Sequence, residues 1–273
     1  MTEKTQNGLI ETRVSVLDWN IWWRFGPWQE RAPAIVATLS DLDADIITLQ
    51  EVWSDATTNY ASILAAELGY HHVHATGMKQ KGLRAGNAIL SRWPIKHHEM
   101  IRLYAQKGIE ENRVAIYAEI DGPRGQLPVF CTHLNWKQHH SHIRQRQVTD
   151  LARFVQKNHV TNYPPIVCGD FNADPRSDEI HMMTGNTTCP VEGLVFHDAW
   201  AFAGTDGPGY TWDNRNPFAR EVLESNRRID YIFAGFPGSR GAGHIVDCQI
   251  AGNQPVKGVW PSDHFALLAE LRY

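Results

Sequence analysis

Polar side chains that can carry acid–base chemistry or bind a metal follow short apolar runs at six places in this sequence. The most informative is Gly169-Asp170-Phe171-Asn172, which places a carboxylate and a carboxamide two residues apart directly after the apolar run 165–168. The other places hold these residues: Asp18 and Asn20, Gln50 and Glu51, His133, Asp230, and Asp263 and His264. Because such runs predict buried strands, we expect the polar groups to converge in one active site. Their oxygen atoms suit a hard divalent cation such as Mg²⁺, with Mn²⁺ or another divalent ion as a substitute.

Asp230 lies within the strongly apolar run 229–233. A buried carboxylate needs a cation or an imidazole beside it, and His264 is the natural partner. An Asp–His pair fixes the imidazole tautomer and raises its basicity, which gives a group that exchanges protons near neutral pH. The alternative for His264 is an ordinary core histidine.

The remaining polar groups each have a structural alternative. Glu51 is expected to bind the metal, or else to cap a helix that begins near Ser54. Asn20 and Asn172 could offer amide groups to the site or could serve turn chemistry alone. His133 is a candidate donor to a charged oxygen, although a lone strand histidine is more often structural.

The reaction that fits these groups best is phosphoester hydrolysis. The sequence has no nucleophilic serine motif and no glycine-rich phosphate loop. A metal would neutralise the phosphoryl charge and stabilise the leaving oxygen, while a base orients a water molecule in line.

Composition bounds the class of protein. The 273 residues, 42% of them hydrophobic, predict one domain over 1–273, with residues 1–11 as a flexible tail. The net charge of −4 is a poor match to a protein that grips long nucleic acid. The four cysteines have no metal-ligand spacing and are expected to be structural, reduced thiols. No apolar run is long enough to span a bilayer, so we expect a cytoplasmic protein without stable membrane insertion.

The apolar patterning predicts layered α/β architecture. Strands are expected at 13–19, 45–49, 87–91, 113–120, 127–133, 165–169, 229–233, 244–250 and 265–271, and helices at 30–41, 54–68 and 141–157. Residues 121–125 predict a hairpin turn between two of the strands. Among histidines in polar connecting segments, we expect His140 and His142 to come nearest to the cleft because they follow His133 closely.

At this point the sequence resembles the endonuclease/exonuclease/phosphatase superfamily, the deoxyribonuclease-I-like proteins. The matches occur in order along the chain at 19–20, 49–51, 86–91, 132–134, 169–172, 228–231 and 262–264. The resemblance implies a four-layer α/β/β/α sandwich in which two packed mixed sheets are flanked by helices. It also implies an active-site cleft at one edge of the sheets.

The resemblance implies roles for the site residues as well. Glu51 would be the main metal ligand, helped by Asn20 and Asp263. Asp170 would orient or deprotonate water, and Asn172 would hold the phosphate. His264 would be paired with Asp230, and His133 would stabilise the pentacovalent phosphate. Arg113 corresponds to a position that contacts a phosphate oxygen in some members, with a surface salt bridge as the alternative. Asn87 is a further candidate for substrate binding.

One position departs from the family pattern. Where several nucleases of the family carry an acidic residue two positions after the first asparagine, this chain has Trp22. The departure weakens the case for a two-metal scheme.

The substrate is less defined. Four tryptophans and a phenylalanine lie between residues 19 and 28, and Trp212 lies in another predicted loop. These aromatic residues, Trp22 and Trp212 in particular, could contact substrate, or the residues between 19 and 28 could form a local core that holds a long loop.

We expect the substrate to be a small or lipid-like phosphodiester. Cleavage of DNA or RNA is the alternative, favoured if a positive groove is built from Arg144, Arg146, Arg215, Arg220, Arg227 and Arg228. A phosphomonoesterase and a noncatalytic binding module on the same scaffold are further alternatives.

Overall fold

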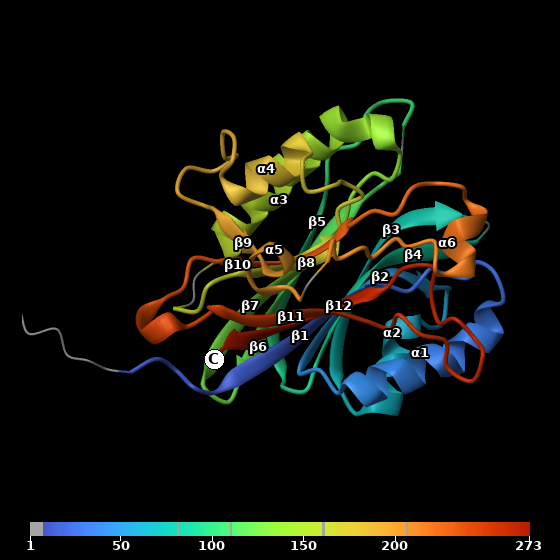
Figure 1. The fold of residues 1–273 in the computed structure, drawn as a ribbon, viewed down its shortest axis with the longest axis horizontal. Coiled ribbons are helices and arrows are strands. Elements are labelled where there is room, and N and C mark those ends of the chain that lie inside the picture. Colours follow the sequence, from blue (N-terminus) through green and yellow to red (C-terminus); the bar gives the residue numbers. More distant parts are fainter. Residues whose placement is uncertain (1–7, 81, 110, 160–161, 206) are drawn as a thin grey trace, which may run out of the picture.

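A computed structural model describes residues 8–273 except 81, 110, 160, 161 and 206. Its strands form two mixed six-stranded sheets (Figure 1). The first sheet has the order β11 (Ile245–Ala251), β12 (Ala266–Arg272), β1 (Arg13–Asn20), β2 (Ile46–Ser54), β4 (Leu83–Ser91), β3 (His71–Gln80). The second has the order β5 (Ile95–Arg102), β6 (Val114–Gly122), β7 (Gly125–His133), β8 (Ile166–Asp170), β10 (Asp230–Gly235), β9 (Phe196–Asp198).

Helices cover the outer face of each sheet. α1 (Trp28–Leu42) and α2 (Tyr60–Leu68) pack Ile35, Leu39 and Leu64 against the first sheet. α3 (Ser141–Asn158) and α4 (Asp178–Thr184) pack Leu151 and Ile180 against the second. Two short helices, α5 (Ala199–Ala203) and α6 (Pro217–Glu221), lie in connecting segments. The predicted four-layer α/β/β/α sandwich is therefore confirmed (Figure 1).

The faces of the sheets follow the two-residue period of a strand. In β1, Val14 and Val16 lie in the core between the sheets, whereas Leu17 and Trp19 belong to the core beneath α1. In β8, Ile166 and Cys168 likewise face the other sheet and Val167 faces the helices. The last residues of both strands therefore point into the space between the sheets.

Two parallel pairs and their antiparallel neighbours bring the polar strand ends together. β1 runs parallel to β2, and β7 runs parallel to β8, so the carboxyl ends of each pair coincide. The register pairs His133 with Asp170, and the antiparallel β10 pairs Asp230 with the same Asp170. β12 is antiparallel to β1, which places its start beside Asn20.

The predicted elements were incomplete in places. The helix expected over 54–68 is shorter, because β2 continues to Ser54 and α2 begins at Tyr60 with Asn59 as its cap. Strands β3, β5 and β9 were not predicted, and β5 is an edge strand whose side chains are mostly exposed. The predicted hairpin at 121–125 is present between β6 and β7.

Of the predicted tail 1–11, residues 1–7 lie outside the described residues. Ile10 donates a backbone hydrogen bond to Arg240, 3.0 Å away. Among the described helices, none has both the length and the apolar character needed to cross a membrane.

Candidate active site

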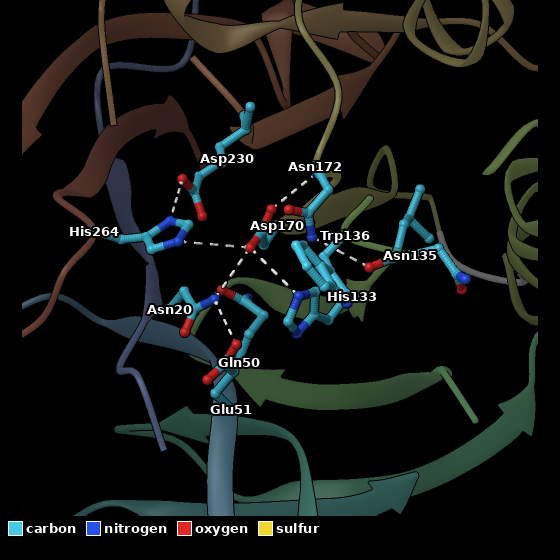
Figure 2. A network of polar contacts seen from close by, with 12 residues as sticks. Asn20, Gln50, Glu51, His133, Asn135, Trp136, Asp170, Asn172, Asp230 and His264 are labelled. Atoms are coloured by element: carbon cyan, nitrogen blue, oxygen red, sulfur yellow. Dashed lines mark hydrogen bonds and ion pairs between the residues drawn. The ribbon is translucent and has the colours of Figure 1, made fainter. Parts of the chain in front are cut away.

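Asp170 is the centre of the polar groups at the strand ends (Figure 2). Its Oδ2 accepts a hydrogen bond from Asn20 Nδ2 at 3.0 Å and lies 3.4 Å from His133 Nε2 and 3.9 Å from His264 Nε2. Its Oδ1 accepts from the backbone N–H of Asn172 at 2.8 Å. One carboxylate thus meets groups from β1, β7 and the segment before β12, as the sequence predicted for the set as a whole.

His264 is held between two carboxylates. Its Nδ1 lies 2.9 Å from Asp230 Oδ2, which leaves Nε2 directed toward Asp170 (Figure 2). The ring of Trp212 packs edge-on against the imidazole with 5.1 Å between ring centroids. Asp230 itself is fully buried. The Asp–His pair expected from the sequence is therefore formed.

Burial and neighbouring charges shift the acid–base properties of these groups. Burial, together with the charge of Asp230, raises the pKa of Asp170 to about 7. Burial opposes the charged form of His264, but the surrounding carboxylates, Asp230 first, outweigh it and raise its pKa well above the usual value. Burial, with Arg113 and His264, lowers the pKa of His133 well below its usual value. At neutral pH the site therefore holds a cationic His264, a neutral His133 and a carboxyl group poised to gain or lose a proton.

Glu51 has the features of a metal ligand. It lies within β2, not at its end as expected, at a bulge where the pairing with β4 shifts register and its φ is +56°. Its Oε1 is 3.5 Å from Asn20 Nδ2, and its buried Oε2 has no hydrogen-bond partner among the described residues. Burying an unpaired carboxylate oxygen is costly, so a cation fits this position.

Asp263 adds a second carboxylate to that position. Burial is the main cause that raises its pKa to about 7, and the charge of Glu51 contributes in the same direction. Two carboxylates that disfavour each other's ionisation would both be stabilised by a cation. Asn20 Oδ1 accepts from the backbone N–H of Trp22 at 3.0 Å, and its second lone pair remains for a metal.

A second set of potential ligand atoms, from Asp170, Asp230 and His264, lies within 4.8 Å of one another. Asp230 Oδ2 bonds to His264 Nδ1, and Asp170 Oδ2 accepts from Asn20 Nδ2, whereas Asp230 Oδ1 has no partner among the described residues. Because Asp170, Asp230 and His264 are held to each other or to Asn20 by these bonds, we assign them to acid–base chemistry. We assign Glu51, with Asn20 and Asp263 as its neighbours, to the metal.

Arg113 and Asn87 line the same cavity, and both are engaged in hydrogen bonds. Arg113 contacts Glu111 and His133, and Asn87 Nδ2 donates to the Val114 carbonyl across the sheet interface at 2.9 Å. Asn172 Nδ2 donates to the Leu134 carbonyl at 3.2 Å. The site residues predicted from the sequence therefore all lie in or beside one cavity.

A model of the Endonuclease/Exonuclease/phosphatase family matches residues 19–264. The chain belongs to this family. The match extends from the strand that carries Asn20 to His264, so it contains the whole candidate site. The predicted phosphoric ester hydrolase is confirmed at the level of the family.

Curated relatives match over most of the chain at low identity. Protein angel of Drosophila melanogaster is 29% identical over 89% of this chain and 72% of its own length. Nocturnin of Rattus norvegicus is 26% identical over 90% of this chain, which spans only 59% of the relative. The uncharacterized protein YbhP of Escherichia coli is 31% identical over 63% of this chain and 70% of its own length.

Solved structures agree in fold. TDP2 of D. rerio, complexed with a single-strand DNA product, superposes with a TM-score of 0.76 at 19% identity and covers 96% of this chain and 100% of its own. An endonuclease/exonuclease/phosphatase from Bacteroides vulgatus gives a TM-score of 0.73 at 22% identity, covering 96% of this chain and 99% of its own.

The candidate active site lies in a cavity of about 530 Å³, and much of the wall of this cavity is apolar. The catalytic groups lie inside, and these large apolar side chains contribute to the lining: Trp22, Phe25, Met78, Trp136, Trp212 and Val222. Phe25, Trp136 and Val222 are strongly exposed at the rim. The cleft therefore combines a charged centre with an apolar entrance.

The tryptophan-rich loop after β1 is both a local core and part of this cleft. Arg31 of α1 is buried and donates to five carbonyl oxygens, those of Ile21, Trp22, Trp23, Phe25 and Pro261. Trp23 is buried and donates to the Arg84 carbonyl, whereas Trp22 packs on Phe218 and lines the cavity. The local core expected for this loop is therefore present, and Trp22 lies where it could contact a substrate.

The sequence analysis did not identify Glu111, Trp136 or Arg31. Glu111 and Trp136 flank Arg113 and His133 by two or three positions, which is a proximity signal that could have found them. Arg31 lies within a predicted helix, and nothing in its local sequence marks it as the anchor of a loop.

Proposed function

We propose that this protein is a divalent-metal-dependent hydrolase of phosphodiester bonds, with Mg²⁺ as the cation and a small or lipid-like organic diester as the substrate. One observation carries the proposal: Asp170 is surrounded by Asn20, His133 and His264, beside Glu51, whose buried Oε2 has no partner among the described residues (Figure 2). This set can bind a phosphoryl group, hold a cation and move protons.

The protein's own groups would divide the work. Asp170 orients a water molecule for in-line attack on phosphorus and accepts its proton, for which a pKa of about 7 is well matched. His264, kept cationic by Asp230, offers an N–H to the phosphoryl oxygens, and His133 offers another. Asn172 fixes Asp170 through its backbone N–H and supports the bound phosphate.

Glu51, Asn20 and Asp263 would hold the metal. When bound, Mg²⁺ or Mn²⁺ would neutralise phosphoryl charge and stabilise the leaving oxygen. A second metal ion would need a further carboxylate at the position that Trp22 occupies, so the residues present support one ion.

The charges and surfaces of the cleft favour a substrate with a single phosphodiester. Both arginines in the lining are ion-paired, Arg113 with Glu111 at 3.0 Å and Arg227 with Asp174 at 3.1 Å. Of the other arginines considered for a nucleic-acid groove, Arg144 and Arg228 are buried against Glu179 and Asp198. The apolar rim instead fits an aromatic or aliphatic alcohol group of the diester, with Trp22 and Trp212 as contacts.

A nuclease is the second candidate, and the solved TDP2 complex with single-strand DNA product favours it. A short single strand could stack its bases on the rim aromatics without a long basic groove. A phosphomonoesterase would use the same catalytic groups, and a noncatalytic module would not require them to be kept together.

The test is an activity panel with Mg²⁺ or Mn²⁺ that includes a bis-aryl phosphodiester, sphingomyelin, single-stranded DNA, RNA and an aryl phosphomonoester. We expect turnover of the phosphodiesters, and the highest turnover for those whose alcohol groups are apolar.

Asp170→Asn and His264→Ala should each lower turnover by ~10²–10⁴-fold with little unfolding. Asp41→Asn, at an exposed position, is the control. Full activity in both active-site variants would refute the role assignment.

We also propose a single domain in a reducing, cytoplasmic setting. Residues of both sheets share one core cluster, which supports one folding unit. All four cysteines are free and three are buried, which fits a compartment where thiols stay reduced.

A further inference from the structure

Arg113 is bound on two sides within the candidate site. Its Nε and Nη2 both donate to Glu111 Oε2, at 3.1 and 3.0 Å. Its Nη1 lies 3.0 Å from His133 Nδ1. The side chain is 11% exposed and Glu111 is 15% exposed, so the two groups meet largely away from solvent.

The contact with His133 fixes where the imidazole carries its proton. A guanidinium is always protonated and has only donors, so His133 Nδ1 must accept and cannot itself bear hydrogen. The single ring proton then lies on Nε2, which is 3.4 Å from Asp170 Oδ2 and faces the catalytic centre. Arg113 therefore selects the tautomer that presents an N–H to the cleft.

Glu111 in turn fixes Arg113. It accepts from the Trp136 backbone N–H at 3.3 Å, and its Oε1 lies 3.6 Å from Nδ1 of the buried His140. These contacts leave the carboxylate little freedom, and the two charge-assisted N–H bonds that converge on its Oε2 orient the guanidinium so that Nη1 reaches His133.

We propose that Glu111 and Arg113 are positioning residues that hold His133 as an Nε2–H donor to the phosphoryl group, and that Arg113 acts through His133 and not by binding phosphate. The inference rests on the proposed phosphodiesterase function. It differs from the expectation that Arg113 contacts a phosphate oxygen directly.

The first test reads the tautomer without any activity. Isotope-labelled imidazole nitrogens are observed by NMR, and the His133 signals are assigned by their loss in His133→Ala. The wild-type protein should show protonated Nε2 and unprotonated Nδ1. Arg113→Met, and to a smaller degree Glu111→Gln, should shift His133 toward a mixture of tautomers. An unchanged His133 tautomer in a folded Arg113→Met protein would overturn the proposal.

The second test is a double-mutant cycle on the best diester from the activity panel. Arg113→Met should lower kcat by ~10–100-fold with KM near the wild-type value. In the His133→Ala background, the same substitution should cost little more, because the group through which Arg113 acts is already gone. Arg113→Lys, which keeps the charge but cannot bridge Glu111 and His133 as a fork, should not restore kcat.

The matched control is Arg92→Met, which removes an arginine ion-paired with Asp45 near the opposite end of β2. It should leave kcat and the His133 signals unchanged. A rise in KM with unchanged kcat, or a full additional loss in the His133→Ala background, would show that Arg113 binds phosphate directly. Absence of diesterase activity in the wild-type protein would defeat the proposed function, and the NMR result would still decide the positioning role.

Discussion

At the scale of single residues, the site is a set of buried groups whose charges depend on one another. Asp170 and Asp263 each have a pKa of about 7, and burial is the main cause in both. Such shifts mean that the folded protein holds protons that the unfolded chain would release. The electrostatics therefore link catalysis, metal binding and stability.

Asp263 should make the metal-free protein less stable as pH rises. Its pKa moves from 3.8 to about 7 on folding, so between these values the native state binds more protons than the unfolded state. The free energy of unfolding of the wild-type protein then falls as pH increases through that window. At pH values above the window, Asp263→Asn should be more stable than wild type by up to about 4 kcal/mol. Urea unfolding with a chelator at several pH values measures this. A wild-type–variant difference that does not grow with pH would contradict it, and Asp41→Asn is the control.

Glu51→Gln should chiefly affect metal binding. The substitution keeps the shape of the side chain but removes the negative charge of a carboxylate whose Oε2 has no partner in the part of the chain that the structure describes. The Mg²⁺ concentration for half-maximal activity should rise ~10–100-fold, and calorimetric metal affinity should fall in parallel. Glu30→Gln, at an exposed position in α1, should change neither. Equal metal affinity in Glu51→Gln and wild type would move the metal to another set of ligands.

At the scale of elements, the shape of the cleft depends on a bulge and on an anchored loop. The bulge in β2 ends at the pair Val52–Gly86, and a Cβ atom at Gly86 would come within 1.8 Å of the Ala75 carbonyl oxygen. The loop after β1 contains two tryptophans with positive φ, Trp22 and Trp23, which is unusual for bulky residues. Contacts from α1 hold it in that form.

Arg31→Met should destabilise the protein and release this loop. Five carbonyl oxygens would lose their donor, at a cost of about 3 kcal/mol or more in the free energy of unfolding. Chemical denaturation and proteolysis between residues 21 and 27 measure the two effects. The control is Arg153→Met, on an exposed position of α3. If the variant unfolded at the wild-type denaturant concentration, the loop would not depend on this anchor.

The cavity-facing residues of the loop should affect substrate affinity. Combined Trp22→Ala and Phe25→Ala should raise KM for an apolar diester by roughly 10-fold, because apolar contact area at the rim is lost. KM for a diester with small alkyl groups should change less. Phe236→Ala removes a side chain that is 62% exposed and is not in the cavity lining, and it serves as the control. Unchanged KM values would leave the loop with only its structural role.

At the scale of the whole molecule, net charge and charge pairing set the response to salt. The chain carries a net charge of −4, and the cavity arginines are neutralised by carboxylates. For an oligonucleotide substrate bound by its backbone, log affinity would fall with log salt by about 0.7 for each phosphate neutralised. We expect a slope near zero for kcat/KM on the preferred diester, measured over a range of salt concentrations. A steep slope, together with cleavage of single-stranded DNA, would favour the nuclease.

The sequence by itself determined the fold class and the members of the site, because strand and helix periods and the residue types at strand ends are local properties. Asn20, His133, Asp170 and Asp230 could be placed in this way. Glu51 was also predicted as a member of the site, but its position within β2 and its direction could not be predicted, because they are set by the bulge against β4, which is a property of strand pairing. The tertiary structure alone decided that Arg31 anchors the loop and that Glu111 and Arg113 meet His133, because these contacts depend on side-chain packing between elements that no local pattern records.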